Sequence, residues 1–180
     1  LSGNRLRVEW TVKNTGEHTM YYAIGGHPGF RLDRGTALTD YALTFDRPVR
    51  LAARRMDGRL VSRSTYPIAE KSDHLPLSPT LLENDSLAFE SGIRTVTLEN
   101  PRTGYRLQMD LTGAPILAVW TDPETVQHAE FLCIEPWYGI GDFTGEAPQE
   151  ISQHYLEQKL SKSTSWVGGY SLCVGNEEIF

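Results

Sequence analysis

The sequence contains 180 residues, of which 39% are hydrophobic and 22% charged, as in an ordinary single globular domain with a substantial core. Its net charge of −6 argues against nucleic acid or an anionic membrane surface as a partner. No apolar run has the length of a membrane span, so we expect a cytoplasmic protein without membrane contact. The two cysteines, Cys133 and Cys173, lie in apolar segments, which indicates reduced core thiols.

The first half of the chain shows strand patterns separated by turns. Residues 6–12 alternate between apolar and polar side chains, which indicates a strand with one buried face. Asn14-Thr15-Gly16 predicts a turn and residues 19–24 a second strand, so we expect a hairpin here. Residues 41–45 alternate again, and Asp57-Gly58 predicts a tight turn between two short strands.

The second half continues in the same way. Ser78 followed by Pro79 predicts an N-cap and a short helical turn that ends at Leu82. Residues 149–160 are compatible with either helix or strand. Further strands are expected at residues 87–89, 96–98, 105–111, 116–120, 131–135 and 170–174. Many short strands with frequent Gly and Pro turns predict an all-β sandwich or barrel, formed as one domain over residues 1–180.

The apolar strand at residues 131–134 ends in a carboxylate, Glu135, and Pro136 follows directly. Partial burial disfavours ionisation and raises a carboxyl pKa toward neutrality, as a general base requires. The rings of Trp137 and Tyr138 suit a ligand with apolar faces and a polar rim, such as a sugar. The alternative is structural, namely a strand-end Glu that hydrogen-bonds a neighbouring backbone.

A second candidate is His27, which lies in the segment Gly25-Gly26-His27-Pro28-Gly29-Phe30. Three glycines and a proline indicate a bent backbone that side chains cover little, so a ligand can approach the imidazole closely. An imidazole and a carboxylate that face each other across a pocket form an acid/base pair without metal or cofactor. Residues 27 and 135 are far apart in sequence, so only the fold can bring them together. Asp85, in a predicted turn, is a third candidate.

Other site chemistries have little support. The five histidines are not in ligand spacing and there is no Cys-x-x-Cys, which argues against a zinc site. Phosphate-loop, dinucleotide and nucleophile-elbow motifs are absent, so we expect no cofactor. Arg54 and Arg55, with Arg47 and Arg50 nearby, are candidates for holding a phosphate, although a solvated strand edge explains them better.

Three segments of the chain are Gly-Gly-His-Pro-Gly-Phe at 25–30, Glu-Asn-Asp-Ser-Leu-Ala-Phe at 83–89 and Cys-Ile-Glu-Pro-Trp-Tyr-Gly at 133–139. They resemble segments of aldose 1-epimerases (galactose mutarotases), and in particular of the bacterial branch named for the LacX protein. The tract from 154 to 175 is similar to the end of that branch. The resemblance therefore covers nearly the whole chain.

The resemblance implies a large antiparallel β-sandwich, the galactose mutarotase-like supersandwich, and interconversion of the α and β anomers of a free aldose. It implies that Glu135 is the base that deprotonates the anomeric hydroxyl. It implies that His27 is the acid that protonates the ring oxygen. Asp85 matches a carboxylate that hydrogen-bonds sugar hydroxyls, and we expect Trp137 to form a wall of the pocket.

Members of the family carry a portion ahead of the matched region, which supplies a second active-site His and a sugar-binding Arg. None of Arg5, Arg7 and His18 sits in the matching motif. We therefore expect an N-terminally truncated enzyme with impaired catalysis, and unpaired sheet edges that allow self-association. Two alternatives are a non-catalytic carbohydrate-binding module on the same fold and a hexose-6-phosphate 1-epimerase that uses the Arg47–Arg55 cluster.

Overall fold

The computed structural model describes residues 3–90 and 92–175, in which nearly all regular structure is β-strand. The strands are β1 (Arg5–Lys13), β2 (Met20–Tyr22), β3 (Ile24–Gly25), β4 (Gly29–Arg31), β5 (Ala42–Asp57), β6 (Leu60–Pro76), β7 (Leu87–Phe89), β8 (Thr95–Asn100), β9 (Tyr105–Asp110), β10 (Ile116–Trp120), β11 (Phe131–Tyr138), β12 (Gln158–Leu160) and β13 (Ser165–Val174). The helical turns are η1 (Leu38–Asp40), α1 (Pro79–Leu82), η2 (Val126–His128) and η3 (Ile151–Gln153). The all-β prediction is confirmed.

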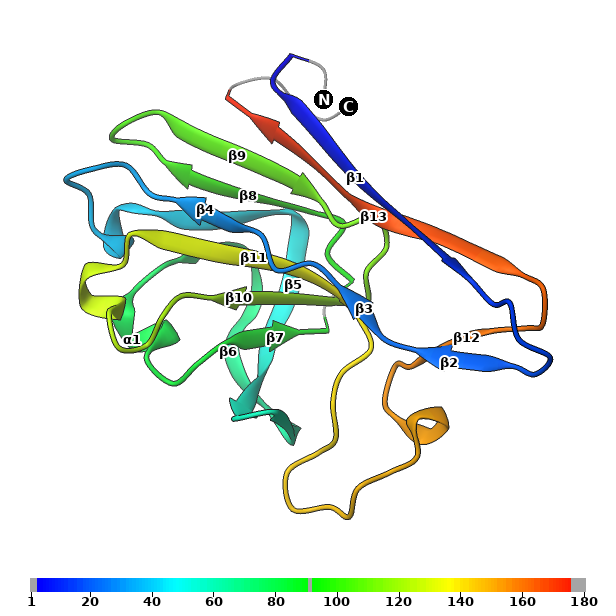
Figure 1. Cartoon of the computed structure of the whole chain (residues 1–180). Coiled ribbons are helices and arrows are strands. Elements are labelled where there is room, and N and C mark those ends of the chain that lie inside the picture. The colour runs from blue at the N-terminus through cyan, green and yellow to red at the C-terminus, as the bar shows by residue number, and fades with distance from the viewer. Residues whose placement is uncertain (1–2, 91, 176–180) are drawn as a thin grey trace.

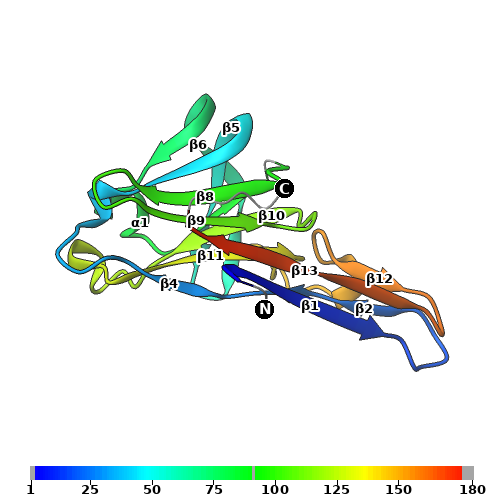
Figure 2. The same cartoon turned by 90° about the horizontal axis from the view of Figure 1, so that it is seen from above.

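Eleven strands form one antiparallel sheet in the order β1-β13-β9-β8-β5-β7-β10-β11-β3, with β4 paired to β11 and β6 to β5. The long strand β5 joins two halves of this sheet, β1-β13-β9-β8 on one side and β7-β10-β11-β3 on the other. Its residues 42–45 pair with β8 and its residues 53–55 pair with β7. Register shifts interrupt the β5–β6 ladder, and such irregularities bend a strand. The sheet therefore curls, as Figures 1 and 2 show from two directions.

The two halves of the sheet share one hydrophobic core. Leu43, Leu98 and Met109 come from one half, and Phe89 and Ile134 from the other; all five are fully buried. Full burial of a large apolar side chain contributes about 1.5–3 kcal/mol. Contacts between non-polar side chains of the two halves therefore stabilise the curled shape of the sheet.

Strand β11 is buried on both faces, which explains its nearly continuous apolar sequence. Because side chains alternate along a strand, Leu132 and Ile134 enter the main core, whereas Cys133 and Glu135 point to the opposite face. That face carries a smaller apolar cluster of its own: Val61, Ala88, Ile116, Ile140 and Phe143, with Met56, Trp137 and Leu156 packed against them. Glu135 therefore lies on the face of β11 that carries this smaller apolar cluster.

Two local predictions are confirmed. The side chain of Ser78 caps α1 by accepting a hydrogen bond from the backbone N–H of Leu81 at 3.3 Å. The chain turns at Asp57-Gly58, where Gly58 has φ +62°. The strands on either side of this turn are 16 and 17 residues long, so the expectation of short strands there is wrong.

The predicted hairpin between residues 6–12 and 19–24 is also wrong. β1 pairs with β13, and β2 pairs with β12 in a separate two-stranded sheet. The turn does form at Asn14, whose buried side-chain amide donates to the carbonyls of His18 and Leu160 at 2.8 and 3.0 Å. It joins two different ladders, because each strand finds its partner near the end of the chain.

β1 is the last strand at one end of the sheet, so within residues 3–90 and 92–175 its outer edge has no neighbouring strand. Self-association through such an edge stays a prediction. Among the described helices, none has the length and apolar character that a membrane crossing requires.

Candidate active site

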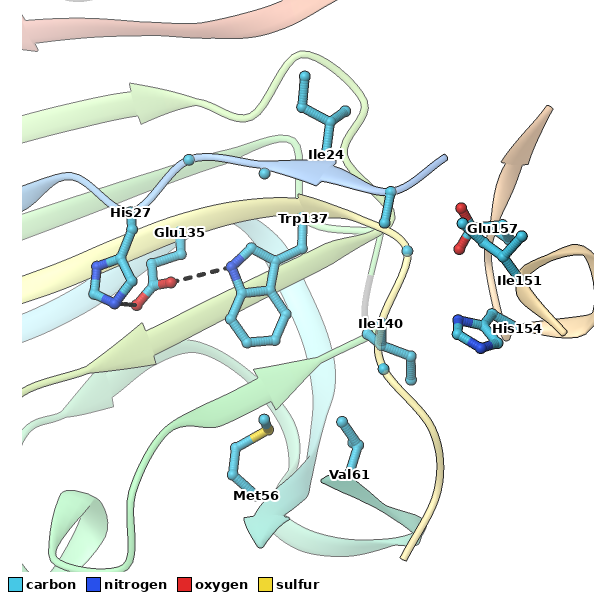
Figure 3. A pocket seen from close by; sticks show the side chains of 15 residues that line it. Ile24, His27, Met56, Val61, Glu135, Trp137, Ile140, Ile151, His154 and Glu157 are labelled. Carbon is cyan, nitrogen blue, oxygen red and sulfur yellow. Dashed lines mark hydrogen bonds and ion pairs between the residues drawn. The ribbon is translucent and has the colours of Figure 1, made fainter. Parts of the chain in front are cut away.

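Strand register brings His27 and Glu135 together. β3 pairs with β11 at Gly25 and Trp137, and β4 pairs with β11 at Gly29 and Cys133. His27 lies midway between these two pairs and therefore opposite Glu135. Its Nε2 atom is 3.5 Å from Oε1 of Glu135 (Figure 3). The imidazole is largely exposed, whereas the carboxylate side chain is only 2% exposed.

Trp137 lies on the same face of β11, two residues after Glu135. Its indole Nε1 donates a hydrogen bond to Oε2 of Glu135 at 3.1 Å (Figure 3). Gly25 allows this close packing, since a Cβ at that position would lie 2.9 Å from Cδ1 of Trp137. The two carboxylate oxygens of Glu135 thus face different partners, the imidazole on one side and the indole on the other.

Burial raises the pKa of Glu135 above its ordinary value, and the negative charge of Asp85 raises it further. The charge of His27 and the hydrogen bond from Trp137 act in the opposite direction. Burial, with the charge of Glu135, also raises the pKa of the neighbouring Cys133 thiol to about 12. A carboxyl group whose pKa is raised in this way is a suitable general base near neutral pH.

A cavity of about 460 Å³ opens beside this pair, a size typical of small-molecule sites. Its walls come from the segment before β4, the end of β11 and the loop after it, the β5–β6 hairpin, and the segment around η3. The lining residues are Ala23, Ile24, Gly25, Gly26, His27, Met56, Val61, Glu135, Trp137, Gly139, Ile140, Gly141, Ile151, His154 and Glu157. Trp137 forms part of the wall next to an apolar surface.

Ile151, His154 and Glu157 were not predicted as site residues (Figure 3). Their segment, residues 149–160, holds a 3₁₀ turn and the three-residue strand β12, so it shows neither a helical nor a strand periodicity clearly. Both carboxylate oxygens of Glu157 are buried and have no hydrogen-bond partner in the described part of the chain. Burial raises the pKa of Glu157, and the nearby His154 lowers it. No sequence motif marks this carboxylate.

Asp85 does not line the cavity. It precedes β7 with φ +79°, and its Oδ1 accepts a hydrogen bond from the N–H of Ser86 at 2.7 Å. It lies close enough to Glu135 to raise that residue's pKa. A role for Asp85 in binding sugar hydroxyls stays a prediction.

The arginines of β5 do not converge on the cavity. Arg54 is buried and paired with Glu90, with Nε 2.5 Å from Oε1. Arg47 donates to the carbonyl of Gly92, and the guanidinium of Arg55 lies over the ring of Tyr66. No Arg or Lys is among the described residues that line the cavity.

One set of potential metal ligands comes together among residues 3–90 and 92–175. The ligand atoms of His27, Cys133 and Glu135 lie within 4.8 Å of one another. Sequence spacing could not detect this set, because His27 lies between β3 and β4 whereas Cys133 and Glu135 lie on β11.

No protein-family profile matches the sequence. Solved structures are similar over almost the whole chain. A galactose mutarotase related enzyme from Lactobacillus acidophilus superposes with a TM-score of 0.82 at 24% identity, covering 98% of this chain and 59% of that one. A galactose mutarotase-like protein from Lactobacillus casei gives 0.78 at 26% identity, covering 94% and 58%. The fold is therefore the galactose mutarotase-like fold.

Curated relatives agree with this class. The plasmid-encoded LacX protein of Lactococcus lactis subsp. lactis is 31% identical over 147 residues, which cover 78% of this chain and 48% of LacX. The chromosomal LacX protein matches over the same lengths. The chain belongs to the galactose mutarotase-like family, on the branch that includes LacX. It spans about half the length of the curated relatives that it matches.

Proposed function

We propose that the chain is an aldose 1-epimerase, or the part of one that carries the acid/base pair. The observation that supports this most is the position of His27 opposite Glu135, 3.5 Å apart at the wall of a cavity. The apolar wall around Trp137 suits a sugar ring, and a free hexose is the substrate class that the cavity favours. Within the described lining, the absence of Arg and Lys favours an unphosphorylated sugar.

In this mechanism Glu135 accepts the proton of the anomeric hydroxyl while protonated His27 donates a proton to the ring oxygen. The bond between the anomeric carbon and the ring oxygen breaks, and the anomeric carbon becomes an aldehyde. Rotation about the adjacent carbon–carbon bond turns the other face of the aldehyde to the ring hydroxyl. His27 then takes the hydroxyl proton back and Glu135 returns its own, which closes the ring as the other anomer.

The test is the optical rotation of freshly dissolved α-glucose and α-galactose with the purified chain. Acceleration that disappears in Glu135→Gln and His27→Ala variants would support the epimerase. If only a longer chain with the family's upstream portion were active, the expectation of a truncated enzyme would be supported. Sugar binding without acceleration in either length, unaffected by both substitutions, would favour the carbohydrate-binding module and contradict the proposal.

We further expect Glu157 to accept hydrogen bonds from sugar hydroxyls, because its buried oxygens have no partner among the described residues. Hydrogen bonds to a charged group contribute about 1.5–3 kcal/mol, so Glu157→Gln should weaken galactose binding roughly tenfold or more. Calorimetric Kd values check this, and in polarimetry KM should rise while kcat changes little. Glu150→Gln, an exposed change on the same segment, is the control. An unchanged Kd would contradict this role.

A further inference from the structure

Three side chains of different chemistry meet on one face at the end of the cavity. Cys133 and Glu135 are two residues apart on β11, so both point to the same side of the strand. His27 approaches from the neighbouring segment between β3 and β4. The imidazole nitrogen, the thiol sulfur and a carboxylate oxygen lie within 4.8 Å of one another.

These are the three ligand types that zinc prefers in proteins. Ligands bound at about 2.1 Å and separated by the tetrahedral angle lie roughly 3.4 Å apart. Nε2 of His27 and Oε1 of Glu135 are already 3.5 Å apart, so this pair needs no rearrangement to share an ion. The sulfur lies within 4.8 Å of both other ligand atoms, so it must move closer to them to reach bonding distance.

We propose that His27, Cys133 and Glu135 form a binding site for Zn²⁺ or a similar thiophilic divalent cation. The ion would bind the imidazole nitrogen, the Cys133 thiolate and the Glu135 carboxylate. As the ion binds, the thiol releases its proton to solvent. Three protein ligands leave a fourth tetrahedral position for water.

The surroundings allow the ion to enter. The His27 side chain is 60% exposed, and the cavity reaches both His27 and Glu135. Cys133 itself is buried, with 3% of its surface exposed, and lies behind the cavity lining to which the other two ligands belong. The ion also supplies positive charge next to two groups whose ionisation burial disfavours.

Occupation of this site has a consequence that rests on the proposed function. An ion bound to His27 and Glu135 ties up the proposed acid and base together. Zn²⁺ therefore inhibits mutarotation, and a chelator restores it. Binding itself does not depend on the epimerase proposal, because it requires only the three ligands.

The test uses the purified reduced chain titrated with Co²⁺ and, separately, with Zn²⁺. Co²⁺ bound through a thiolate gives a sulfur-to-metal charge-transfer band in the near ultraviolet. The band should appear with one equivalent of Co²⁺. It should vanish in Cys133→Ser but persist in Cys173→Ser, a change at the other buried cysteine. Calorimetric Zn²⁺ affinity should fall in Cys133→Ser by more than the roughly 10- to 100-fold cost of an outer-shell partner.

Because Cys133 is buried, circular dichroism must first show that its variant folds. His27→Ala changes a largely exposed side chain and gives an independent test, with the same expected loss of Zn²⁺ affinity. A band that persists in Cys133→Ser, or Zn²⁺ affinity that neither variant reduces, would overturn the site. If Co²⁺ binds as expected but neither the metal-free chain nor a longer form with the upstream portion shows mutarotation, the epimerase proposal fails and the metal site stands.

Discussion

Glu135→Gln is expected to lower kcat/KM for galactose mutarotation by about 10²–10⁴-fold, the usual contribution of a positioned general base. The amide keeps the size of the side chain and still accepts the hydrogen bond from Trp137, but it cannot accept the anomeric proton. Polarimetry with EDTA present measures this, in the chain or in a longer form if only that is active. Glu130→Gln, an exposed change just before β11, is the control. A variant that kept a tenth of the activity would contradict the role of Glu135.

The same substitution should stabilise the protein at neutral and alkaline pH. Burial raises the pKa of Glu135 in the folded state, so the unfolded chain loses this proton at lower pH than the folded one. Stability from this group is therefore greatest below its unfolded pKa and falls as pH rises to the folded value. Two neighbouring charges also act on the pKa of Glu135: the charge of His27 lowers it and the charge of Asp85 raises it. Cys133 lies beside the carboxylate.

The difference in Tm between Glu135→Gln and the unmodified chain should consequently be larger at pH 8 than at pH 4, in favour of the variant. Activity has the opposite dependence, because the base must be ionised. The acid limb of kcat/KM should show an apparent pKa above the ordinary value for Glu, about 4.3. Thermal scans and pH profiles in metal-free buffer measure both. A Tm difference that grew toward acid pH would contradict the raised pKa.

Gly169→Ala should cause the largest loss of stability outside the site. Gly169 lies in β13 opposite Glu9 of β1, with φ +146°. A Cβ there would lie 2.0 Å from the carbonyl oxygen of Val8, a contact that only backbone movement can relieve. Overpacking against backbone, together with strain at a positive φ, should cost about 3 kcal/mol or more. In a chain of this size the Tm would fall by roughly 6–12 °C.

Gly104→Ala provides the matched control. Gly104 also has a positive φ, +76°, but a Cβ there would meet nothing within 4 Å. It isolates the backbone strain, which should cost about 1 kcal/mol. Urea unfolding of both variants measures the two losses. Equal losses would show that the contact with β1 is unimportant.

Local patterns predicted most individual strands but not their partners. The alternation in residues 6–12 and the apolar run at 131–135 both indicate strands, and the structure contains β1 and β11 there. The hairpin prediction failed because the Asn14-Thr15-Gly16 motif specifies a turn, whereas pairing depends on burial and on strands far along the chain. Residues 149–160 could not be assigned because they contain only short pieces of regular structure.

In the candidate site, too, local sequence patterns identified individual residues but not their spatial partners. Residue types and flanking breakers pointed to His27 and Glu135, and strand register places them together. Asp85 lies outside the cavity wall, and its position depends on the turn before β7, which the sequence does not fix in space. The position of Glu157 in the cavity wall and the approach of His27 to Cys133 depend on tertiary contacts, which no local sequence pattern predicts.

The pairing of β1 with β13 has a consequence for how the chain is made. Arg5 pairs with Cys173 and Lys13 with Ser165, separations of 168 and 152 residues. Synthesis at about 5–20 residues per second leaves the first strand without its partner for roughly 8–34 seconds. Contacts this distant in sequence also slow folding. The segment that carries His27 likewise pairs with β11, so the acid/base pair is assembled only after β11 has been synthesised. During that interval the edge of β1 is exposed to other chains, and a partner or chaperone that shields it would raise the yield of folded protein.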